Sequence, residues 1–434
     1  MDEITVGILG ILILVIILFF TGLEMAFAFA IVGFFGFACL TSFSSAFSIL
    51  AKDYFDTFDS YSFTVIPVFI LMGQIAFNAG IAKRLYATVH KFIGHIPGGL
   101  AIATVIGATL FKAICGSSPA TTATFASVAV PEMDHYGYDK RLSTGVVATV
   151  GTLGIIIPPS ISLIVFALIT EQSIGALFMA GLIPGLMVAL FYALTIVGWC
   201  RINPSIAPRG ERYGWKDRMK SLPEVIWVVI IFLIMLAGLL KGIFTPTEAG
   251  SVVTFVVLVV TVIKKDVHFR EYAKSIVESL RIAGMIVFIL AGSVVFGHFL
   301  AVSKIPLVTA AWITSLPFPP FVIMIIILLA YQIGGSFIDD FAFMIMATPI
   351  FYPAVIKLGY DPIWFGIIIG VNLMIGMVIP PVAMGVFIVK NITKVPFNVI
   401  YKGVYPFLVG LMIILVLLFS FPQIVTFLPH ALYK

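Results

Sequence analysis

The sequence has little charge and few cysteines, and both shortages limit the class of protein that it can encode. Charged residues make up 10% of its 434 residues and hydrophobic residues 61%, whereas a soluble domain carries about 25% charged residues. We therefore predict an integral membrane protein. The net charge of +5 does not indicate nucleic acid as a partner, because the basic residues lie in short loops. The three cysteines are too few and too scattered for a disulfide framework or a metal site.

The motifs of several enzyme classes are also missing. The chain has no His-Glu-x-x-His zinc motif, no serine-centred elbow and no glycine-rich phosphate loop. No second carboxylate motif stands on a facing segment to work with Asp339. An intramembrane enzyme that uses Asp339 or a Ser/His pair is therefore the weaker interpretation, and we expect no enzymatic activity. Hydrolysis of a membrane substrate by the purified protein would contradict this expectation.

What the sequence does contain is one pattern that occurs twice. The same residue types recur 222 positions apart without a gap. The first copy consists of Pro131, Gly137, Tyr138, Asp139, Gly154, Ile157, Pro158 and Pro159. A second match, between 69–77 and 288–296, is offset by 219. Glycine and proline thus interrupt two hydrophobic segments at matching places, which is the best sequence indication of a transporter's binding site.

Apolar segments of about 20 residues predict membrane spans. Such segments lie near 4–21, 24–47, 61–80, 142–170, 175–199, 224–243, 246–263, 277–301, 362–389 and 403–429. Two longer apolar blocks, 97–133 and 318–355, each contain a polar break and predict re-entrant helical hairpins. Backbone of this kind is tolerated at membrane depth only inside protein or beside a wet cavity. The predicted fold class is an all-α polytopic membrane protein.

The distribution of lysine and arginine predicts the orientation of these spans. With the N-terminus outside, the inner face receives 18 basic residues and the outer face 5. The first hairpin then enters from the cytoplasm and the second from outside, so the two halves are inverted repeats. The start, Met1-Asp2-Glu3, lacks a basic region and predicts an uncleaved first span. The predicted parts are N-terminal scaffold helices in 1–60, a first repeat in 61–199, a cytoplasmic loop and connecting helices in 200–276, a second repeat in 277–429 and a tail in 430–434.

Paired prolines break two of the predicted spans, at 154–159 and at 376–381. A proline lacks an N–H and clashes with the carbonyl one turn earlier, so several carbonyls lose their helical partners. A hard cation such as Na+ takes oxygen ligands, and these carbonyls with nearby hydroxyls supply them. A structural proline kink without a ligand is the alternative. We expect each break to face the hairpin tip of its own half.

The candidate residues for a coupling cation lie at the tips and the breaks, and Na+ is the only metal ion that we expect. The first-half site consists of Gly116, Ser117, Ser118, Gly151, Thr152, Gly154, Ile157 and Pro158. The second-half site consists of Gly334, Gly335, Ser336, Asp339, Asn372, Gly376 and Ile379. Helix N-termini in the hairpins suit an anionic substrate. The substrate candidates are Ser118, Pro119, Thr121, Thr122, Ser336 and Asp340.

Three charged residues near the tips leave alternatives open. Spacing alone does not separate the roles of Asp339 and Asp340, one of which binds a cation or helix N-terminus while the other is structural. Lys112 lies five residues before Ser117. For its side chain, snorkelling or pairing is favoured over attraction of a substrate carboxylate. No organic cofactor is expected.

These residues resemble the large membrane subunit of tripartite ATP-independent periplasmic (TRAP) transporters. The stretches that carry the resemblance are 66–73, 115–123, 154–160, 349–353 and 376–381. It implies an elevator-type fold of the ion-transporter superfamily and Na+-coupled uptake of an organic acid, such as a dicarboxylate or sialic acid, delivered by a periplasmic binding protein. It also implies a small membrane subunit on a separate chain and a place in the bacterial inner membrane. The family's cation sites would fall on Ser117, Ser118, 151–158, 334–336, Asp339 and 376–380.

Two other kinds of transport protein remain open. A related elevator carrier that works without a binding protein would share the hairpins and breaks. Neighbouring reading frames for a small membrane subunit and a secreted binding protein would distinguish the two. A passive channel is the third possibility, but hairpins that close from opposite faces suit alternating access better.

Overall fold

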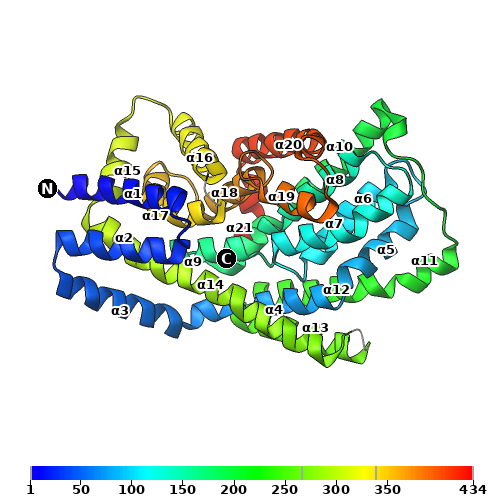
Figure 1. Ribbon diagram of the computed structural model, residues 1–434, viewed down its shortest axis with the longest axis horizontal. Helices are drawn as coiled ribbons and strands as arrows, with labels where there is room; N and C mark the ends of the chain where they lie inside the picture. The colour runs from blue at the N-terminus through cyan, green and yellow to red at the C-terminus, as the bar shows by residue number, and fades with distance from the viewer. Residues whose placement is uncertain (1, 265–266, 338–339, 433–434) are drawn as a thin grey trace.

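The computed structural model describes residues 2–264, 267–337 and 340–432, and the regular elements in these ranges are all helices. Eight of the described helical segments are long and apolar enough to cross a membrane. This confirms the expectation of an all-α, multi-span membrane protein, whose arrangement Figure 1 shows.

The helices of the first half are as follows: α1 (Glu3–Phe20), α2 (Met25–Leu40), α3 (Phe43–Asp59), the short 3-10 helix η1 (Tyr61–Thr64), α4 (Val65–Asn78), α5 (Ile81–Ile93), α6 (Gly99–Lys112), α7 (Ser118–His135), α8 (Lys140–Val150), η2 (Gly151–Ile155), α9 (Ile161–Thr170) and α10 (Ile174–Ile202). A connection with η3 (Pro204–Ile206) and α11 (Trp215–Ser221) follows. The second half comprises α12 (Pro223–Leu240), α13 (Pro246–Ile263), α14 (Phe269–Val302), α15 (Ile305–Ser315), α16 (Pro320–Phe337), α17 (Asp340–Lys357), α18 (Pro362–Gly376), α19 (Met384–Thr393), α20 (Phe397–Ser420) and α21 (Gln423–Leu432).

Both long apolar blocks fold as pairs of helices joined by a break. These pairs are α6 with α7 and α16 with α17, and in each pair the two helices pack against each other. Both proline-broken segments are also divided, into α8, η2 and α9 in the first half and into α18 and α19 in the second. The helices α7 and α17 begin and end 222 positions apart, the same offset as the sequence pattern. Return of each hairpin to one membrane face stays a prediction.

The repeated Gly-Tyr-Asp motif forms the turn that leads into each broken helix. Gly137 and Gly359 have φ of 74° and 83°, a left-handed conformation that other residues rarely adopt. Two residues later, Asp139 and Asp361 are the N-caps of α8 and α18, and each side chain accepts a hydrogen bond from a backbone N–H of the first turn. The motif therefore recurs because each half needs the same turn and the same helix start.

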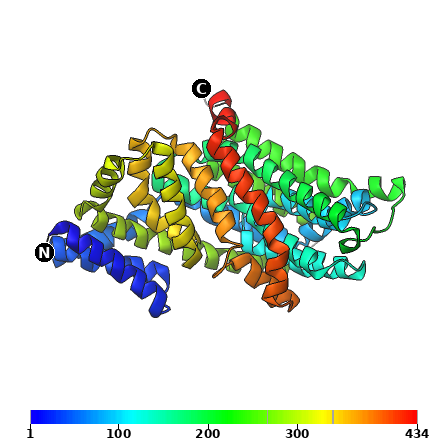
Figure 2. The same ribbon diagram turned by 90° about the horizontal axis from the view of Figure 1, so that it is seen from above.

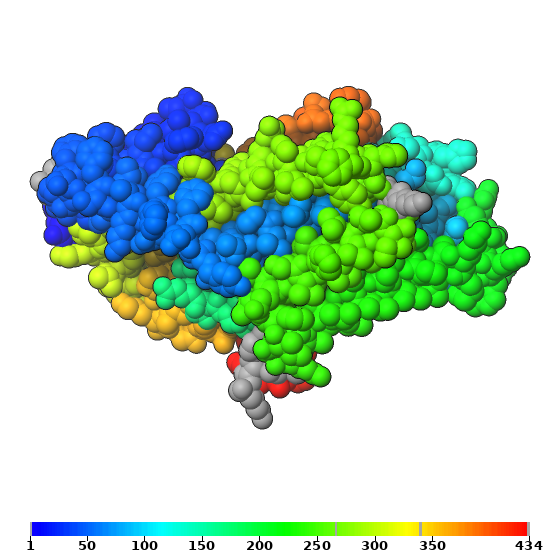
Figure 3. Space-filling model, turned by 90° about the horizontal axis from the view of Figure 1, so that it is seen from below, coloured from blue at the N-terminus to red at the C-terminus, as the bar shows by residue number. Residues whose placement is uncertain are grey.

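The long helix α14 runs antiparallel to α3 and α4. Near its start, Ser275 Oγ accepts a hydrogen bond from Asn78 Nδ2 at 2.8 Å. Near its end, His298 Nδ1 lies 2.7 Å from Asp53 Oδ2. Figure 3 shows α3 and α4 in blue on this face, beside the green helices of the second half. Because α4 and α14 are the helices matched at the offset of 219, the two halves run in opposite directions here, as an inverted repeat requires.

The later helices of the two halves also pack across each other. Helix α20 contacts α8 and α10 of the first half as well as α18 of its own half, and Figure 2 shows its long course across the molecule. Helix α19 packs on α7, and the corresponding helix α9 packs on α17. Each broken helix thus supports the hairpin of the other half, so the two interrupted segments share one centre.

Two predicted spans have wrong boundaries. The segment 24–47 divides into α2 and α3, because the Ser42 hydroxyl accepts a hydrogen bond from Ser45 N and starts a new helix. The acidic residues 53–59 belong to α3, where Asp53 is buried. The segment 403–429 divides between α20 and α21 at Pro422, which cannot continue a helix.

Candidate functional site

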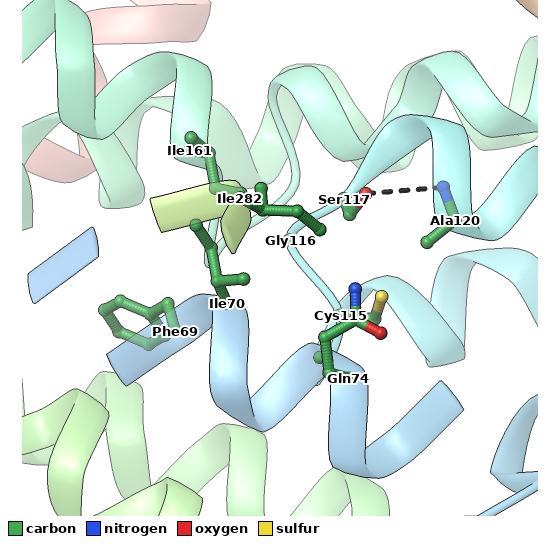
Figure 4. Close-up of a pocket in the computed structure, with 10 residues that line it drawn as sticks. Phe69, Ile70, Gln74, Cys115, Gly116, Ser117, Ala120, Ile161 and Ile282 are labelled. Carbon is green, nitrogen blue, oxygen red and sulfur yellow. Dashed lines mark hydrogen bonds between the residues drawn. The ribbon is translucent and has the colours of Figure 1, made fainter. Parts of the chain in front are cut away.

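A cavity of about 380 Å³ lies where the hairpins and the broken helices meet. The first tip, both breaks, the start of α17 and one face of α14 line it. The lining residues are Met25, Gly116, Ser117, Ser118, Pro119, Ile155, Ile161, Ser162, Ile282, Met285, Ile286, Ile289, Phe341, Leu373, Met377, Val382 and Met384. A much smaller pocket adjoins it between α4 and the first tip, where Gln74 lies beside Cys115 and Gly116 (Figure 4).

Four helix N-termini converge on the larger cavity. Its wall includes Ser118 at the start of α7, Ile161 at the start of α9, Met384 at the start of α19 and Phe341, the second residue of α17. The first N–H groups of a helix have no partner within the helix, and the N-terminus carries a partial positive charge. No charged side chain is among the described lining residues. Among the described residues of the wall, the helix ends are therefore the groups that favour an anion.

The first tip and the first break are in contact, as expected from the sequence. A β-carbon on Gly151 would collide with the hydroxyl of Thr122, and Gly116 lies against the carbonyl of Pro159. The Ser117 side chain caps α7 by accepting a hydrogen bond from Ala120 N at 3.3 Å, which Figure 4 shows. This cap, together with the proline at the next helical position, fixes where α7 begins.

Lys112 extends into the space between the tip and the break. It is fully buried, and its Nζ donates a hydrogen bond to the Ser117 carbonyl at 2.8 Å. A β-carbon on Gly154 would collide with Nζ, Cε and Cδ of this lysine. The side chain therefore does not snorkel. Of the alternatives that the sequence left open, the structure shows pairing of the Lys112 side chain, and its partner is the main-chain carbonyl of Ser117.

Side-chain hydroxyl groups donate hydrogen bonds to carbonyls at the first break. Thr152 Oγ1 donates to the Thr149 carbonyl at 2.7 Å and lies 3.0 Å from the Tyr192 hydroxyl. Ser160 Oγ donates to the Ile155 carbonyl and also accepts from the N–H of Leu163, so it starts α9. Sequence reasoning missed Ser160 as a site residue. Its place directly after Pro-Pro, at the start of an apolar run, was a usable signal for a helix N-cap.

The predicted residues of the first half fall into two groups. Gly116, Ser117, Ser118 and Pro119 line the cavity, whereas Gly151, Thr152, Gly154, Ile157 and Pro158 lie buried behind it. The hydroxyls of Thr121 and Thr122 donate to the carbonyls of Ser117 and Ser118 within α7, at 3.0 and 3.1 Å. These two threonines were predicted to bind substrate, but their hydroxyls are used inside the helix.

The second half brings fewer of its predicted residues together. Asn372 is buried, and its Nδ2 donates to the carbonyl of Leu328 in α16 at 3.3 Å. The Ser336 hydroxyl donates to the carbonyl of Gln332 at 2.7 Å, within its own helix. Gly376 ends α18 and is buried. Among the described residues, no hydrogen bond joins Ser336 to the second break.

Other second-half candidates lie at the tip. Gly334 is packed against the ring of Phe343, with no space for a β-carbon. Gly335 is buried and Ile379 is half-buried. Asp339 lies outside the described residues, and the side chain of Asp340 is likewise not described. A residue that the sequence analysis overlooked is Gln332, whose Oε1 is buried and has no hydrogen-bond partner among the described residues. As a polar residue inside an apolar run it was recognisable.

The two breaks differ in their exposure. Residues 155–160 of the first break are all buried, whereas Pro380 and Pro381 of the second are exposed. Both contain a cis bond between the paired prolines, Pro158-Pro159 and Pro380-Pro381. The second interruption is therefore open to the molecular surface, while protein encloses the first.

This architecture defines a class of protein. Long apolar helices, paired helical hairpins and interrupted helices around a cavity whose described wall carries no charged side chain are features of a membrane permease. The chain is thus a multi-pass membrane protein with the architecture of a permease.

Comparison with known proteins identifies the family. Residues 12–424 match the family described as "Tripartite ATP-independent periplasmic transporter, DctM component". The chain is 35% identical over 382 residues to the C4-dicarboxylate TRAP transporter large permease protein DctM of Pseudomonas aeruginosa, covering 88% of this chain and 89% of that protein. It is 31% identical to the 2,3-diketo-L-gulonate TRAP transporter large permease protein YiaN of Escherichia coli, over 87% and 88% of the two chains. The chain belongs to the TRAP transporter family, as a large permease component.

A solved structure supports the fold. The YdaH transporter of Alcanivorax borkumensis, described as having an unusual topology, matches with a TM-score of 0.59 and 12% identity over 88% of each chain. Large permeases of the TRAP family work with a small membrane subunit and a substrate-binding protein, as the word tripartite indicates.

Proposed function

We propose that this chain is the membrane subunit of a Na+-coupled transporter that imports a small organic anion, a carboxylate or sugar acid. The observation that carries this proposal is the cavity whose wall includes first-turn residues of α7, α9, α17 and α19. The positive ends of four helices stabilise a carboxylate, and no lysine or arginine is among the described residues of the cavity wall. The similar proteins named above transport C4-dicarboxylates and 2,3-diketo-L-gulonate, which are both carboxylates.

Na+ coupling is proposed from the oxygen atoms beside the same cavity. Interrupted helices leave carbonyls without helical partners, and such carbonyls coordinate Na+ in secondary transporters. Candidate ligands in the second half are the Ser336 hydroxyl, the amide oxygen of Asn372 and the carbonyls before Pro380, which we place together with Asp339. An ion bound beside the substrate offsets its charge, so each increases the affinity for the other.

An elevator movement is the proposed mechanism of alternating access. The hairpins and broken helices hold the cavity between them and pack across the two halves. A unit of this kind can move as one body relative to the outer helices, which carries the bound anion across the membrane. The excess of basic residues on one side supports a periplasmic N-terminus, and the proposed location of the permease is the bacterial inner membrane.

The test is reconstitution into proteoliposomes with the small membrane subunit, which we propose to be a separate chain, and with the periplasmic binding protein. Dicarboxylates, sugar acids including sialic acid, and other carboxylates are screened for uptake under an inward Na+ gradient. We expect uptake of one class, dependent on both the gradient and the binding protein. Uptake that proceeds without the binding protein would favour the related elevator carrier, and uptake without any Na+ dependence would contradict the coupling.

A further inference from the structure

Lys112 stands where the sequence places a cation in the first half. It is the last residue of α6, is fully buried, and reaches the Ser117 carbonyl at the tip of the hairpin. Its side chain also covers Gly154 of the break. The Lys112 ammonium group therefore lies among residues of the predicted first-half cation site. Its hydrogen-bond acceptor, the Ser117 carbonyl, is one of the oxygen atoms that would otherwise bind an ion.

The location stabilises a positive charge without a carboxylate. The C-terminal end of a helix carries a partial negative charge, so a lysine that ends α6 is electrostatically favoured. A hydrogen bond from a charged donor contributes more than a neutral one. Together these contacts offset part of the large cost of burying an ammonium group.

The carbonyls of the first-half site already have donors. The Ser117 carbonyl accepts from Lys112 Nζ, from Thr121 Oγ1 and from the backbone N–H of Thr121, so three donors already share its two lone pairs. The Ile155 carbonyl accepts from Ser160 Oγ. A Na+ ion at this place would have to displace these donors and would lie next to a second positive charge.

The second half differs at the same register. The position 222 residues after Lys112 is Gly334, and the position 222 residues after Ser160 is Val382. Neither residue has a side chain that can donate a hydrogen bond. The second half therefore has no counterpart of the Lys112 ammonium group or of the Ser160 hydroxyl at these two positions.

We propose that the Lys112 ammonium is the resident cation of the first-half site and that this site takes no Na+. The inference rests on the proposed function, in which Na+ binds at the interrupted helices, and it assigns the coupling Na+ to the second half. The side-chain charge of Lys112 then takes the place of a bound ion between the tip and the break. Lys112 thereby determines how many Na+ ions are transported with each substrate molecule.

The experiment compares the native protein with Lys112→Met, which keeps the apolar stem and removes the charge. Equilibrium binding of 22Na+ is measured on the purified protein, and the Hill coefficient for Na+ is measured in the uptake assay. We expect Lys112→Met to bind one more Na+ per chain than the native protein and to raise the Hill coefficient by about 1. Lys241→Met, at an exposed lysine far from the tips in sequence, is the matched control and leaves both values unchanged.

Equal Na+ binding by the native protein and Lys112→Met overturns the proposal. If Lys112→Met does not fold, Ser117→Ala combined with Ser118→Ala in the native background replaces it. This pair leaves the bound Na+ unchanged if the first-half site holds none, and a loss of one Na+ overturns the proposal. The absence of Na+-dependent uptake in every protein would contradict the proposed function, whereas the difference in bound 22Na+ would still decide the role of Lys112.

Discussion

At the scale of single residues, glycine and lysine determine how tip and break fit together. The repeated glycines and aspartates were recognisable from the sequence because a turn with positive φ and a helix N-cap each require particular residue types. The place of Lys112 was not recognisable, because five residues of separation from Ser117 do not show whether a side chain turns inward or outward. Its burial depends on Gly154, 42 positions away in sequence, whose missing side chain makes room for it.

Substitution of Gly154 by alanine should therefore destabilise the protein through a collision with Lys112. Overpacking of this kind costs about 1–3 kcal/mol, and we expect a lower thermal unfolding temperature in detergent and weaker uptake. The double variant with Lys112→Ala should recover most of the stability. Gly284→Ala is the control, since nothing lies within 4 Å of a β-carbon there. A Gly154→Ala protein as stable as Gly284→Ala would contradict the observed contact.

Asp139 provides a second prediction at this scale. Hydrogen bonds from Arg141 hold the pKa of its carboxyl group below the ordinary value of 3.8. A group whose pKa is lower in the folded state stabilises the protein above its unfolded pKa and loses that contribution as the pH falls. Asp139→Ala should lower the free energy of unfolding by about 1 kcal/mol at neutral pH, because the helix cap is lost. As the pH falls below the ordinary carboxyl pKa of 3.8, the native protein loses this contribution, so the difference between the two proteins should shrink.

Thermal unfolding of both proteins between pH 7 and pH 3 measures this effect. Asp139→Asn is the matched variant, because the amide oxygen can still accept a hydrogen bond from the helix backbone. An alanine variant whose deficit stays constant over this range would show that the carboxylate charge contributes nothing.

At the scale of helices, the sequence predicted the breaks within helices better than the residues at which helices begin and end. The two paired prolines placed both breaks correctly, since a proline cannot continue an intact helix. The end of α2 at Leu40 was missed although Thr41, Ser42, Ser44 and Ser45 interrupt the apolar run there, because only the structure shows Ser42 as a helix N-cap. The start of α9 needs Ser160 in addition to the prolines, and this requirement follows from the buried Ile155 carbonyl, which only the structure shows.

Ser160→Ala should cost more stability than the removal of an ordinary cap. It removes the acceptor for the first turn of α9 and also leaves the Ile155 carbonyl without its donor. A lost cap costs about 1 kcal/mol, and an unsatisfied buried carbonyl adds about 1–3 kcal/mol. Ser173→Ala, which removes only the cap of α10, is the comparison. Equal unfolding temperatures for the two variants would show that the Ile155 carbonyl finds another donor.

At the scale of the whole molecule, the repeat was predictable and its exact packing was not. Matched glycines and prolines indicated two copies, and the count of basic residues indicated that they are inverted. The antiparallel contact of α14 with α3 and α4 agrees with this for the first long helices. The sequence did not indicate that α14 is one continuous helix, whereas the first half has α3, η1 and α4 in the matching place. Residues 60–64, which contain η1, interrupt the helix in the first copy, and the second copy has no such interruption within α14.

Cysteine pairs test this antiparallel arrangement in a protein without native cysteines. Oxidation should join Asn78→Cys with Ser275→Cys, because these side chains are in hydrogen-bond contact. The same treatment should not join Asn78→Cys with His298→Cys, since His298 lies at the other end of the contact, beside Asp53. Protection from maleimide labelling reports each cross-link. Cross-linking of the second pair instead of the first would mean that the two helices run parallel.

The length of α14 has a consequence for the surrounding lipid. Its 34 residues make a helix of about 51 Å, well beyond the hydrocarbon thickness of about 30 Å. Arg270, Lys274 and Arg281 all lie in the first half of this helix, so with the proposed orientation the surplus turns extend toward the cytoplasmic headgroups. Basic residues near a membrane surface are attracted to anionic lipids. Transport should therefore depend on the phosphatidylglycerol or cardiolipin content of the inner leaflet and much less on that of the outer one.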